Sequence, residues 1–274
     1  MRKFIISSLA MAVIASCSSS NDEIPESNNN GNDANVPYLV TKFTETTQDN
    51  QTFVTEYKYS GDKITEENNI TQNYKIVYTY NGDDIVKTEK YVGTTLDEKR
   101  EFIYSNGKLT TEKVTSKFNS SDPQMMVYTI NYQYLSSTHI KFNRRAGITP
   151  IPSGGYIIEY NDMDAYLSAG GNLASVSYTH NGTTYNTNNT YDNANSPMKN
   201  VKGYIKINMF KDYETGYNNL VSQSNNYSGT VNGTAKIYGN YTFNSADYPT
   251  KAVMTYTSSS FGTNSHTYLY EYNK

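Results

Sequence analysis

The stretch from Val54 to Glu112 decides the fold, because one phrase occurs in it three times: YKYSGDKI at 57–64, YTYNGDDI at 78–85 and FIYSNGKL at 102–109. Each phrase has two aromatic residues at alternate positions, a glycine-containing turn and an aliphatic residue after the turn. Alternate residues of a strand share one face, so the aromatic pairs predict half-buried strands. The constant offset between the second aromatic residue and the aliphatic residue predicts a constant turn geometry.

The turns indicate how the strands pair. Asn81-Gly82 and Asn106-Gly107 are strong hairpin signals, because both residue types tolerate positive φ. A single hairpin is marginal in water, so the repeated units must stabilise one another. The sequence therefore predicts an all-β fold, an antiparallel meander of repeated hairpins that forms one large curved sheet, a sandwich or an open barrel.

Composition supports this fold class. The 274 residues include 28 Tyr, 9 Phe and no Trp, so tyrosine is the main aromatic residue available for a core. Buried tyrosine hydroxyls need partners or water, which predicts a thin, wet core. The formal net charge is −3 and becomes more negative without Arg2 and Lys3. No basic patch is present in the sequence, which argues against nucleic acid as a partner.

The first residues have the pattern of an export signal. A basic start, Met1–Lys3, precedes the apolar run Phe4–Ile14, which is too short for a comfortable membrane span. Ile14-Ala15-Ser16-Cys17 resembles a bacterial lipobox, in which the cysteine is lipidated and becomes the new N-terminus. The alternative is ordinary signal cleavage with an incidental cysteine, although Cys17 is the only cysteine of the chain.

This resemblance implies a membrane anchor and three segments: a lipoprotein signal peptide at 1–16, lipidated Cys17 with a flexible Ser/Asn-rich tether to residue 35, and a single Tyr-rich β-repeat domain at 36–274. Ser18 stands where an Asp would resemble an inner-membrane retention signal. The expected location is therefore the outer membrane, lipid-anchored, on the periplasmic face or the cell surface.

Three segments after the repeats carry further predictions. Residues 126–134 alternate and predict a strand with Met126, Tyr128, Ile130, Tyr132 and Tyr134 on one face. Arg144–Gly155 contains two prolines and reads as a loop. Residues 201–210 fit either alternation or a helix, and we favour a short helix there.

The mature region resembles the Tyr-rich, YD/RHS-like repeat lipoproteins of Bacteroidota, many of which carry a domain of unknown function. The resemblance rests on the three phrases, on Tyr191–Pro197 and on Phe243–Lys251. The Tyr-Asp dipeptide of true YD repeats is replaced by Tyr59-Ser60, Tyr80-Asn81 and Tyr104-Ser105. The resemblance implies an extracytoplasmic, β-rich protein and no particular activity.

Catalytic and metal-binding patterns are weak in this sequence. It has no Gly-x-Ser-x-Gly elbow, and His139, His180 and His266 are scattered. Asp162-Met163-Asp164 is predicted to begin a loop that ends at Gly170-Gly171, and a calcium site stays open there, without the spacing of an EF-hand. We therefore predict a non-enzymatic protein without cofactor, metal site or catalytic residues.

Binding is the remaining function class. We expect a lipid-anchored interaction or structural module of the cell envelope, with envelope proteins or glycan as possible partners. A glycan-binding accessory role in polysaccharide capture is the alternative, and a glycoside-active enzyme is a third. The candidate ligand-facing aromatic residues, chosen for their polar, loop-like context, are Tyr185, Tyr191, Tyr213, Tyr217 and Tyr227.

Overall fold

The computed structural model describes residues 36–119, 122–151, 155–260 and 262–274, and Pro37–Lys274 forms one compact unit. The first half of this unit contains the strands β1 (Val40–Thr46), β2 (Thr52–Ser60), β3 (Lys63–Asn69), β4 (Tyr74–Asn81), β5 (Asp84–Val92), β6 (Thr95–Ser105), β7 (Lys108–Asn119) and β8 (Asp122–Tyr134). The second half contains β9 (His139–Pro150), β10 (Tyr156–Leu167), β11 (Leu173–His180), β12 (Thr183–Tyr191), the helix α1 (Tyr204–Asp212), β13 (Leu220–Gly229), β14 (Gly233–Phe243), β15 (Pro249–Ser258) and β16 (Gly262–Tyr272).

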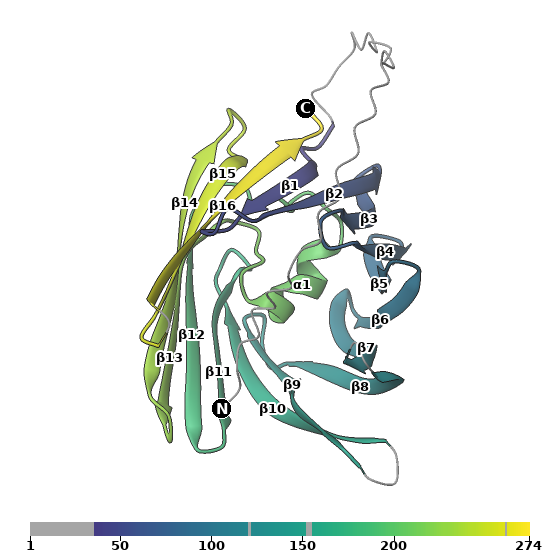
Figure 1. Cartoon of the computed structure of the whole chain (residues 1–274), viewed down its shortest axis with the longest axis vertical. Coiled ribbons are helices and arrows are strands. Elements are labelled where there is room, and N and C mark those ends of the chain that lie inside the picture. The colour runs from purple at the N-terminus through teal and green to yellow at the C-terminus, as the bar shows by residue number, and fades with distance from the viewer. Residues whose placement is uncertain (1–35, 120–121, 152–154, 261) are drawn as a thin grey trace. The chain divides into compact units, whose positions relative to one another are not determined.

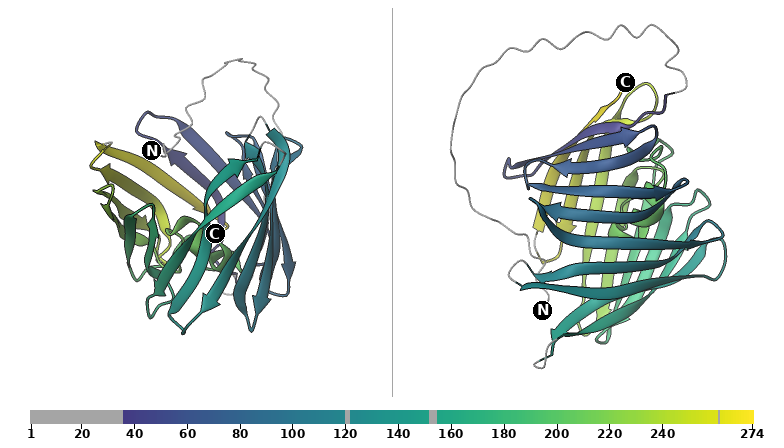
Figure 2. Two further views of the ribbon diagram at one scale, coloured as in Figure 1. Left: turned by 90° about the horizontal axis from the view of Figure 1, so that it is seen from below. Right: turned by 90° about the vertical axis from the view of Figure 1, so that its right-hand side faces the viewer.

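The strands form a closed barrel in which each strand pairs antiparallel with its neighbours in sequence (Figures 1 and 2). The first and last strands complete the ring, with Phe43 of β1 opposite Tyr270 of β16. The predicted all-β antiparallel meander is confirmed, and its closure, which the sequence left open, is that of a barrel. Closure leaves the sheet without outer edges.

The repeated phrases form equivalent hairpins. Tyr59 pairs with Ile64, Tyr80 pairs with Ile85, and Tyr104 pairs with Leu109, each next to a register shift whose extra residue lies in the strand that follows the turn. These three aliphatic side chains are at most 2% exposed. The constant offset in the sequence therefore reflects one hairpin geometry, with an aliphatic residue buried inside the barrel after each turn.

The second aromatic residue of each phrase is a tyrosine whose hydroxyl forms a hydrogen bond with a backbone group of a neighbouring segment. Tyr59 donates to the carbonyl of Val40 at 2.7 Å, and Tyr104 donates to the carbonyl of Ile85 at 2.7 Å. The Tyr80 hydroxyl accepts from the Ile64 amide at 3.2 Å. Each hydroxyl thus obtains the partner that a buried tyrosine requires.

The apolar core lies inside the barrel. On β8 the predicted face is confirmed: Met126, Tyr128, Ile130 and Tyr132 are buried, whereas Val127 between them is 53% exposed. One cluster of buried side chains joins β3–β11 to α1, and a smaller one joins β14 to β15. Strand alternation therefore sends one set of side chains into the interior and the other set outward.

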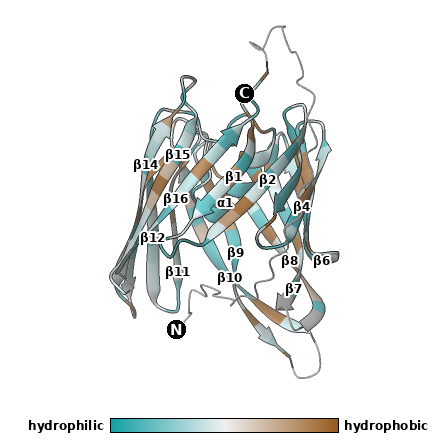
Figure 3. Ribbon diagram, turned by 45° about the horizontal axis from the view of Figure 1, so that its top comes forward, coloured by the Kyte–Doolittle hydropathy of each residue, from teal (hydrophilic) through white to brown (hydrophobic). Residues whose placement is uncertain are grey.

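The outer face carries charged residues at mid-strand. Lys87 pairs with Glu89 on β5 at 2.8 Å, and Lys99 pairs with Glu101 on β6 at 3.0 Å. In the ladder, Glu101 stands opposite Lys87 and Glu89 opposite Lys99, so charges of opposite sign alternate across the two strands. Figure 3 shows hydrophilic residues along the strands, interspersed with isolated hydrophobic ones.

The predicted short helix is confirmed as α1, and it lies within the ring of strands (Figures 1 and 2). Among the described residues no helix has the length and apolar character needed to cross a membrane. The loop predicted at Arg144–Gly155 is wrong, because β9 continues to Pro150 in register with β10. Pro150 fits there because β9 pairs with β8 only as far as Phe142, so this part of β9 is an edge on that side and needs no amide donor there.

Candidate functional site

The long connection between β12 and β13, residues 192–219, enters the barrel and carries α1; we call it the insert. Polar side chains fix its two ends together. The Asp192 carboxylate accepts from the Asn219 amide at 3.0 Å, and the buried Ser196 hydroxyl donates to the Gly216 carbonyl at 2.6 Å. Asn172, from the turn before β11, accepts from the Tyr217 amide at 2.6 Å. The insert is therefore attached to the barrel through specific polar contacts.

The helix of the insert is apolar on several sides. Ile205, Ile207, Met209 and Phe210 are all buried, which is the pattern of a helix surrounded by protein. Its carboxyl end is held by Arg144 of β9, which donates to the Lys211 carbonyl at 3.0 Å. A cation at this end is favourable, because the last carbonyls of a helix are partly negative.

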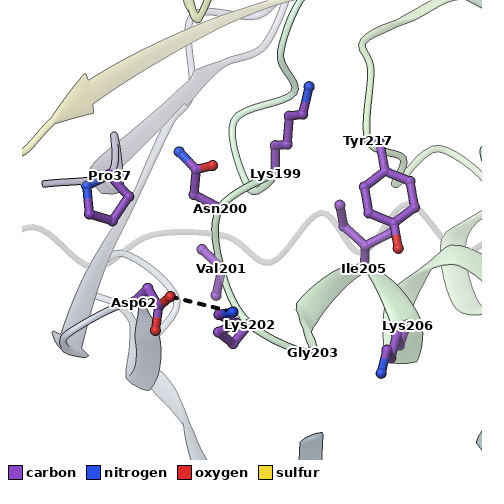
Figure 4. Close-up of a pocket in the computed structure, with 10 residues that line it drawn as sticks. All are labelled: Pro37, Asp62, Lys199, Asn200, Val201, Lys202, Gly203, Ile205, Lys206 and Tyr217. Carbon is purple, nitrogen blue, oxygen red and sulfur yellow. Dashed lines mark ion pairs between the residues drawn. The ribbon is translucent and has the colours of Figure 1, made fainter. Parts of the chain in front are cut away.

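A pocket of about 340 Å³ lies where the insert meets the barrel rim, and we call it the rim pocket (Figure 4). This volume is at the lower end of the range for small-molecule sites. The turn between β2 and β3, the segment before β1 and the insert line it together: Pro37, Asp62, Lys199, Asn200, Val201, Lys202, Gly203, Ile205, Lys206 and Tyr217.

Carboxylates on the barrel neutralise two of the pocket lysines. Lys202 lies 3.9 Å from Asp62 and 3.3 Å from Asp83, and its hydrogen bond and then its charge lower the pKa of Asp83. Lys206 lies 2.7 Å from Asp84. Lys199 instead donates to the amide oxygen of Asn195 at 2.7 Å. The pocket therefore presents both positively and negatively charged hydrogen-bonding groups, the lysines and Asp62, beside the exposed ring of Tyr217.

Below the rim, an ionic cluster is enclosed by the barrel. Arg100 donates to Glu98 at 2.7 Å and also pairs with Glu112, whose side chain is 2% exposed. The Tyr132 hydroxyl donates to the second Glu112 oxygen at 3.1 Å. Burial alone would raise the pKa of Glu98, but the hydrogen bonds and charge of Arg100 lower it overall. Such a saturated network fits a structural role better than a reactive one.

A second group of inward polar residues joins β1, β15 and β16. His266 lies 2.5 Å from Glu45, and the Tyr256 and Tyr268 hydroxyls are 2.8 Å apart. Glu214 of the insert has a pKa raised to about 7 by burial and then by the charges of Asp212 and Glu45. These residues are half-buried although they face inward, so solvent reaches this part of the interior.

The structure places the predicted aromatic residues in different surroundings. Tyr217 is 36% exposed and lines the rim pocket. Tyr185 is stacked between Tyr178, at 4.7 Å between ring centroids, and Tyr227, at 5.9 Å. Both faces of the Tyr185 ring are therefore covered by neighbours, which leaves no face for a flat ligand.

The other two candidates also have protein partners. The Tyr191 hydroxyl accepts from Asn189 at 3.2 Å. The Tyr213 ring lies under the guanidinium of Arg144 at 4.7 Å and follows α1 with φ of 66°. Of the five rings expected to be exposed, only Tyr217 is exposed; the other four are half-buried.

The remaining predicted positions are the lipidation site and the possible calcium site. Cys17 lies outside the described residues. The loop expected to begin at Asp162 is wrong, because β10 continues to Leu167, and Asp164 pairs there with His139 and Lys141. Within the described part of the chain, no three or more Asp, Glu, His or Cys side chains are grouped to hold a metal ion.

Sequence reasoning missed the rim pocket and the ionic cluster. No sequence pattern singled out the three pocket lysines Lys199, Lys202 and Lys206, which lie in a segment predicted to be turn and helix. Arg100 and Glu112 lie in strands rich in charged residues, where only alternation separates inward from outward positions. Counting alternation back from Phe102, which is buried, would have identified Arg100 as inward-facing.

No family model and no curated protein matches the sequence. Among solved structures, a porin-like protein from Bacteroides vulgatus is 14% identical, with 86% of this chain and 99% of that chain covered, at a TM-score of 0.43. A porin-like protein from Bacteroides uniformis is 11% identical, with 86% and 98% covered, at 0.44. Superpositions this loose say nothing about activity.

Proposed function

We propose that this protein is a lipid-anchored outer-membrane or cell-surface protein that acts as a non-enzymatic interaction module. In this proposal the barrel is surrounded by water and does not span the membrane. The observation that carries the proposal is the polarity of the barrel wall. A membrane-spanning barrel has an outward apolar band, and each lysine or arginine at its midplane costs about 2–4 kcal/mol. Here Lys87, Glu89, Lys99 and Glu101 lie outward at mid-strand on β5 and β6, whereas the buried apolar side chains of these two strands, Ile85 and Phe102, point inward.

The insert supports the same interpretation. A pore needs an open interior, but α1 packs its apolar residues against the inward faces of the strands. The interior is therefore a protein core on this side of the barrel. The proposed tether, Ser18–Asn35, lies outside the described residues, and a coil of that length would span about 25 Å between the membrane and the barrel.

The anchor can be tested in the full-length protein expressed in a Gram-negative host. We expect the wild-type chain in the outer-membrane fraction and the Cys17→Ala variant in the soluble extracytoplasmic fraction without detergent. Ser18→Ala is the matched control and should stay with the membrane. A Cys17→Ala protein that has lost its leader and still remains in the membrane after alkaline washing would show that the barrel itself is embedded, contrary to the proposal.

The histidine environments support a role without catalysis. Nε2 of His139 contacts the Asp164 carboxylate, and Nδ1 of His266 contacts the Glu45 carboxylate. Both ring nitrogens of His180 contact amide side chains, those of Asn161 and Asn181. A nucleophile activated by histidine needs a hydroxyl or thiol in that position. Turnover of chromogenic glycosides by the purified protein would contradict the proposed absence of enzymatic activity.

Glycan binding is the second candidate, and one observation favours it: Tyr217 lines the rim pocket together with Asn200 and Asp62. An exposed ring beside amide and carboxylate groups combines an apolar face with hydrogen-bond partners, as small-ligand sites do. Tyr217→Ala should abolish retention of the protein in polysaccharide-containing gels, whereas Tyr238→Ala, an exposed tyrosine on β14, should not. Unchanged retention of Tyr217→Ala would remove this candidate.

A further inference from the structure

The seam between β8 and β9 is short compared with the ladders on either side of it. The two strands pair only at Tyr132–Phe142, Gln133–Lys141 and Tyr134–Ile140. In contrast, β8 pairs with β7 from Asn131 back toward Asp122, and β9 pairs with β10 as far as Pro150. From Asn131 backward, the edge of β8 that faces β9 therefore has no backbone partner strand among the described residues.

Side chains take the place of the missing strand at the start of this edge. The Asn143 carboxamide accepts from the Asn131 amide at 2.6 Å and donates to the Thr129 carbonyl at 3.0 Å. It therefore reproduces the donor and acceptor pattern of one peptide group in a ladder. The Tyr160 hydroxyl lies 3.4 Å from the Thr129 amide, which is a longer and weaker contact.

The edge continues beyond these contacts. Backbone groups alternate in direction along a strand, so the amides and carbonyls of Val127 and Met125 face the same way as those of Thr129 and Asn131. The Val127 side chain is 53% exposed on the outer face. Unpaired strand edges of this kind are templates for another strand.

Charge next to this edge favours one kind of segment. Arg145 of β9 is exposed and lies over the Tyr128 ring at 4.8 Å, with no carboxylate within ion-pair distance among the described residues. The outward residues of β8 along the edge, Val127, Thr129 and Asn131, are uncharged. Because Arg145 lies over the inward Tyr128 ring, a segment along β8 would place near this cation those of its side chains that share the Tyr128 face.

We propose that the β8 edge from Met125 to Asn131 docks an extended, acidic polypeptide segment as an additional antiparallel strand. The backbone of the segment would replace the side chains of Asn143 and Tyr160 as the hydrogen-bond partner of β8. Its carboxylates would lie close to Arg145. This mode of recognition takes most of its affinity from the main chain. The inference deepens the interaction role proposed above and rests on it, since it names the chemistry of a partner.

Fluorescent peptides of about eight residues, a usual strand length, test the proposal on the mature lipoprotein in detergent. One probe alternates Thr and Val with a central Glu, and its counterpart carries a central Lys. We expect the Glu peptide to bind more tightly, and Arg145→Glu to reverse that order. Val127→Pro, which removes one edge amide, should weaken binding about tenfold, whereas Val127→Thr should bind like the wild type.

Two further measurements use the wild-type protein, so they test the proposal even if Val127→Pro does not fold. A Glu peptide N-methylated at alternate residues should lose binding to the wild-type protein, and bound Glu peptide should slow hydrogen exchange of the Val127 and Met125 amides. Absence of binding by both peptides, equal binding by Val127→Pro, or self-association through this edge would overturn the proposal. None of these outcomes depends on membrane release of the Cys17→Ala variant, so the two proposals fail separately.

Discussion

Arg100 and Glu112 form an ion pair inside the barrel, between adjacent strands β6 and β7, with side chains 13% and 2% exposed. Glu98 and the Tyr132 hydroxyl complete the hydrogen bonding of this pair. The neighbouring residue Lys99 points outward and pairs with Glu101 in solvent. One step along the strand therefore separates an enclosed charge from an exposed one.

This contrast gives the first prediction. Arg100→Met should lower the free energy of unfolding by about 3–5 kcal/mol, because it leaves enclosed carboxylates without a cation. Lys99→Met, the matched outward substitution, should change it by about 0–1 kcal/mol. Urea unfolding followed by tyrosine fluorescence measures both, and equal losses for the two variants would contradict the inward placement of Arg100.

Gly203 makes a close approach that a side chain would obstruct. It precedes α1 with φ of 71°, and a Cβ there would lie 3.0 Å from the Ile85 amide nitrogen and 3.1 Å from the Asp83 carbonyl oxygen. Gly203→Ala should destabilise by more than the roughly 1–2 kcal/mol of left-handed strain alone. Gly93→Ala, with φ of 58° and open space around it, isolates that strain term. Equal shifts in unfolding midpoint would argue against close packing of the insert on this hairpin.

The repeated tyrosine hydroxyls should contribute measurably to stability. Tyr104→Phe removes the 2.7 Å hydrogen bond to Ile85 and leaves a carbonyl without that donor, so we expect a loss of about 1 kcal/mol. Tyr59→Phe should behave alike, because its bond to Val40 is equivalent. Tyr91→Phe serves as the control and should be nearly neutral, because Tyr91 follows Lys87 and Glu89 in the outward alternation of β5. A neutral Tyr104→Phe would show that these hydroxyls are satisfied by water instead.

Glu214 should make stability depend on pH. Its pKa rises from 4.5 to about 7 in the folded protein, because burial and the nearby charges of Asp212 and Glu45 disfavour the carboxylate. The folded state therefore binds the proton more tightly, so this contribution is fully present below about pH 4 and is lost as the pH rises through 7. The loss is at most about 3 kcal/mol.

Thermal unfolding between pH 5 and pH 8 measures this effect, since the relevant window lies between the two pKa values. Glu214→Gln should flatten the profile and raise the unfolding temperature at the alkaline end. Glu159→Gln, at an exposed position on β10, is the control and should leave the profile unchanged. A Glu214→Gln profile that matches the wild type would place Glu214 in ordinary solvent.

The sequence by itself determined the repeated hairpins and their inward faces. Tyr59, Tyr80 and Tyr104 stand at a fixed offset before Ile64, Ile85 and Leu109, and both the alternation and the turn residues act over a few neighbouring positions. Short-range patterns of this kind are specified by local backbone geometry and by the need to bury one face. They predicted the antiparallel meander and the face of β8 correctly.

Tertiary structure decided the features that depend on distant partners. The closure of the sheet requires β1 to meet β16, and no local pattern specifies that pairing. Ile205 and Ile207 are both buried because α1 is enclosed by strands, so the helix lacks the one-sided periodicity that would have identified it clearly. The rim pocket likewise exists only because Asp62 and Lys202, far apart in sequence, meet where the insert enters the barrel.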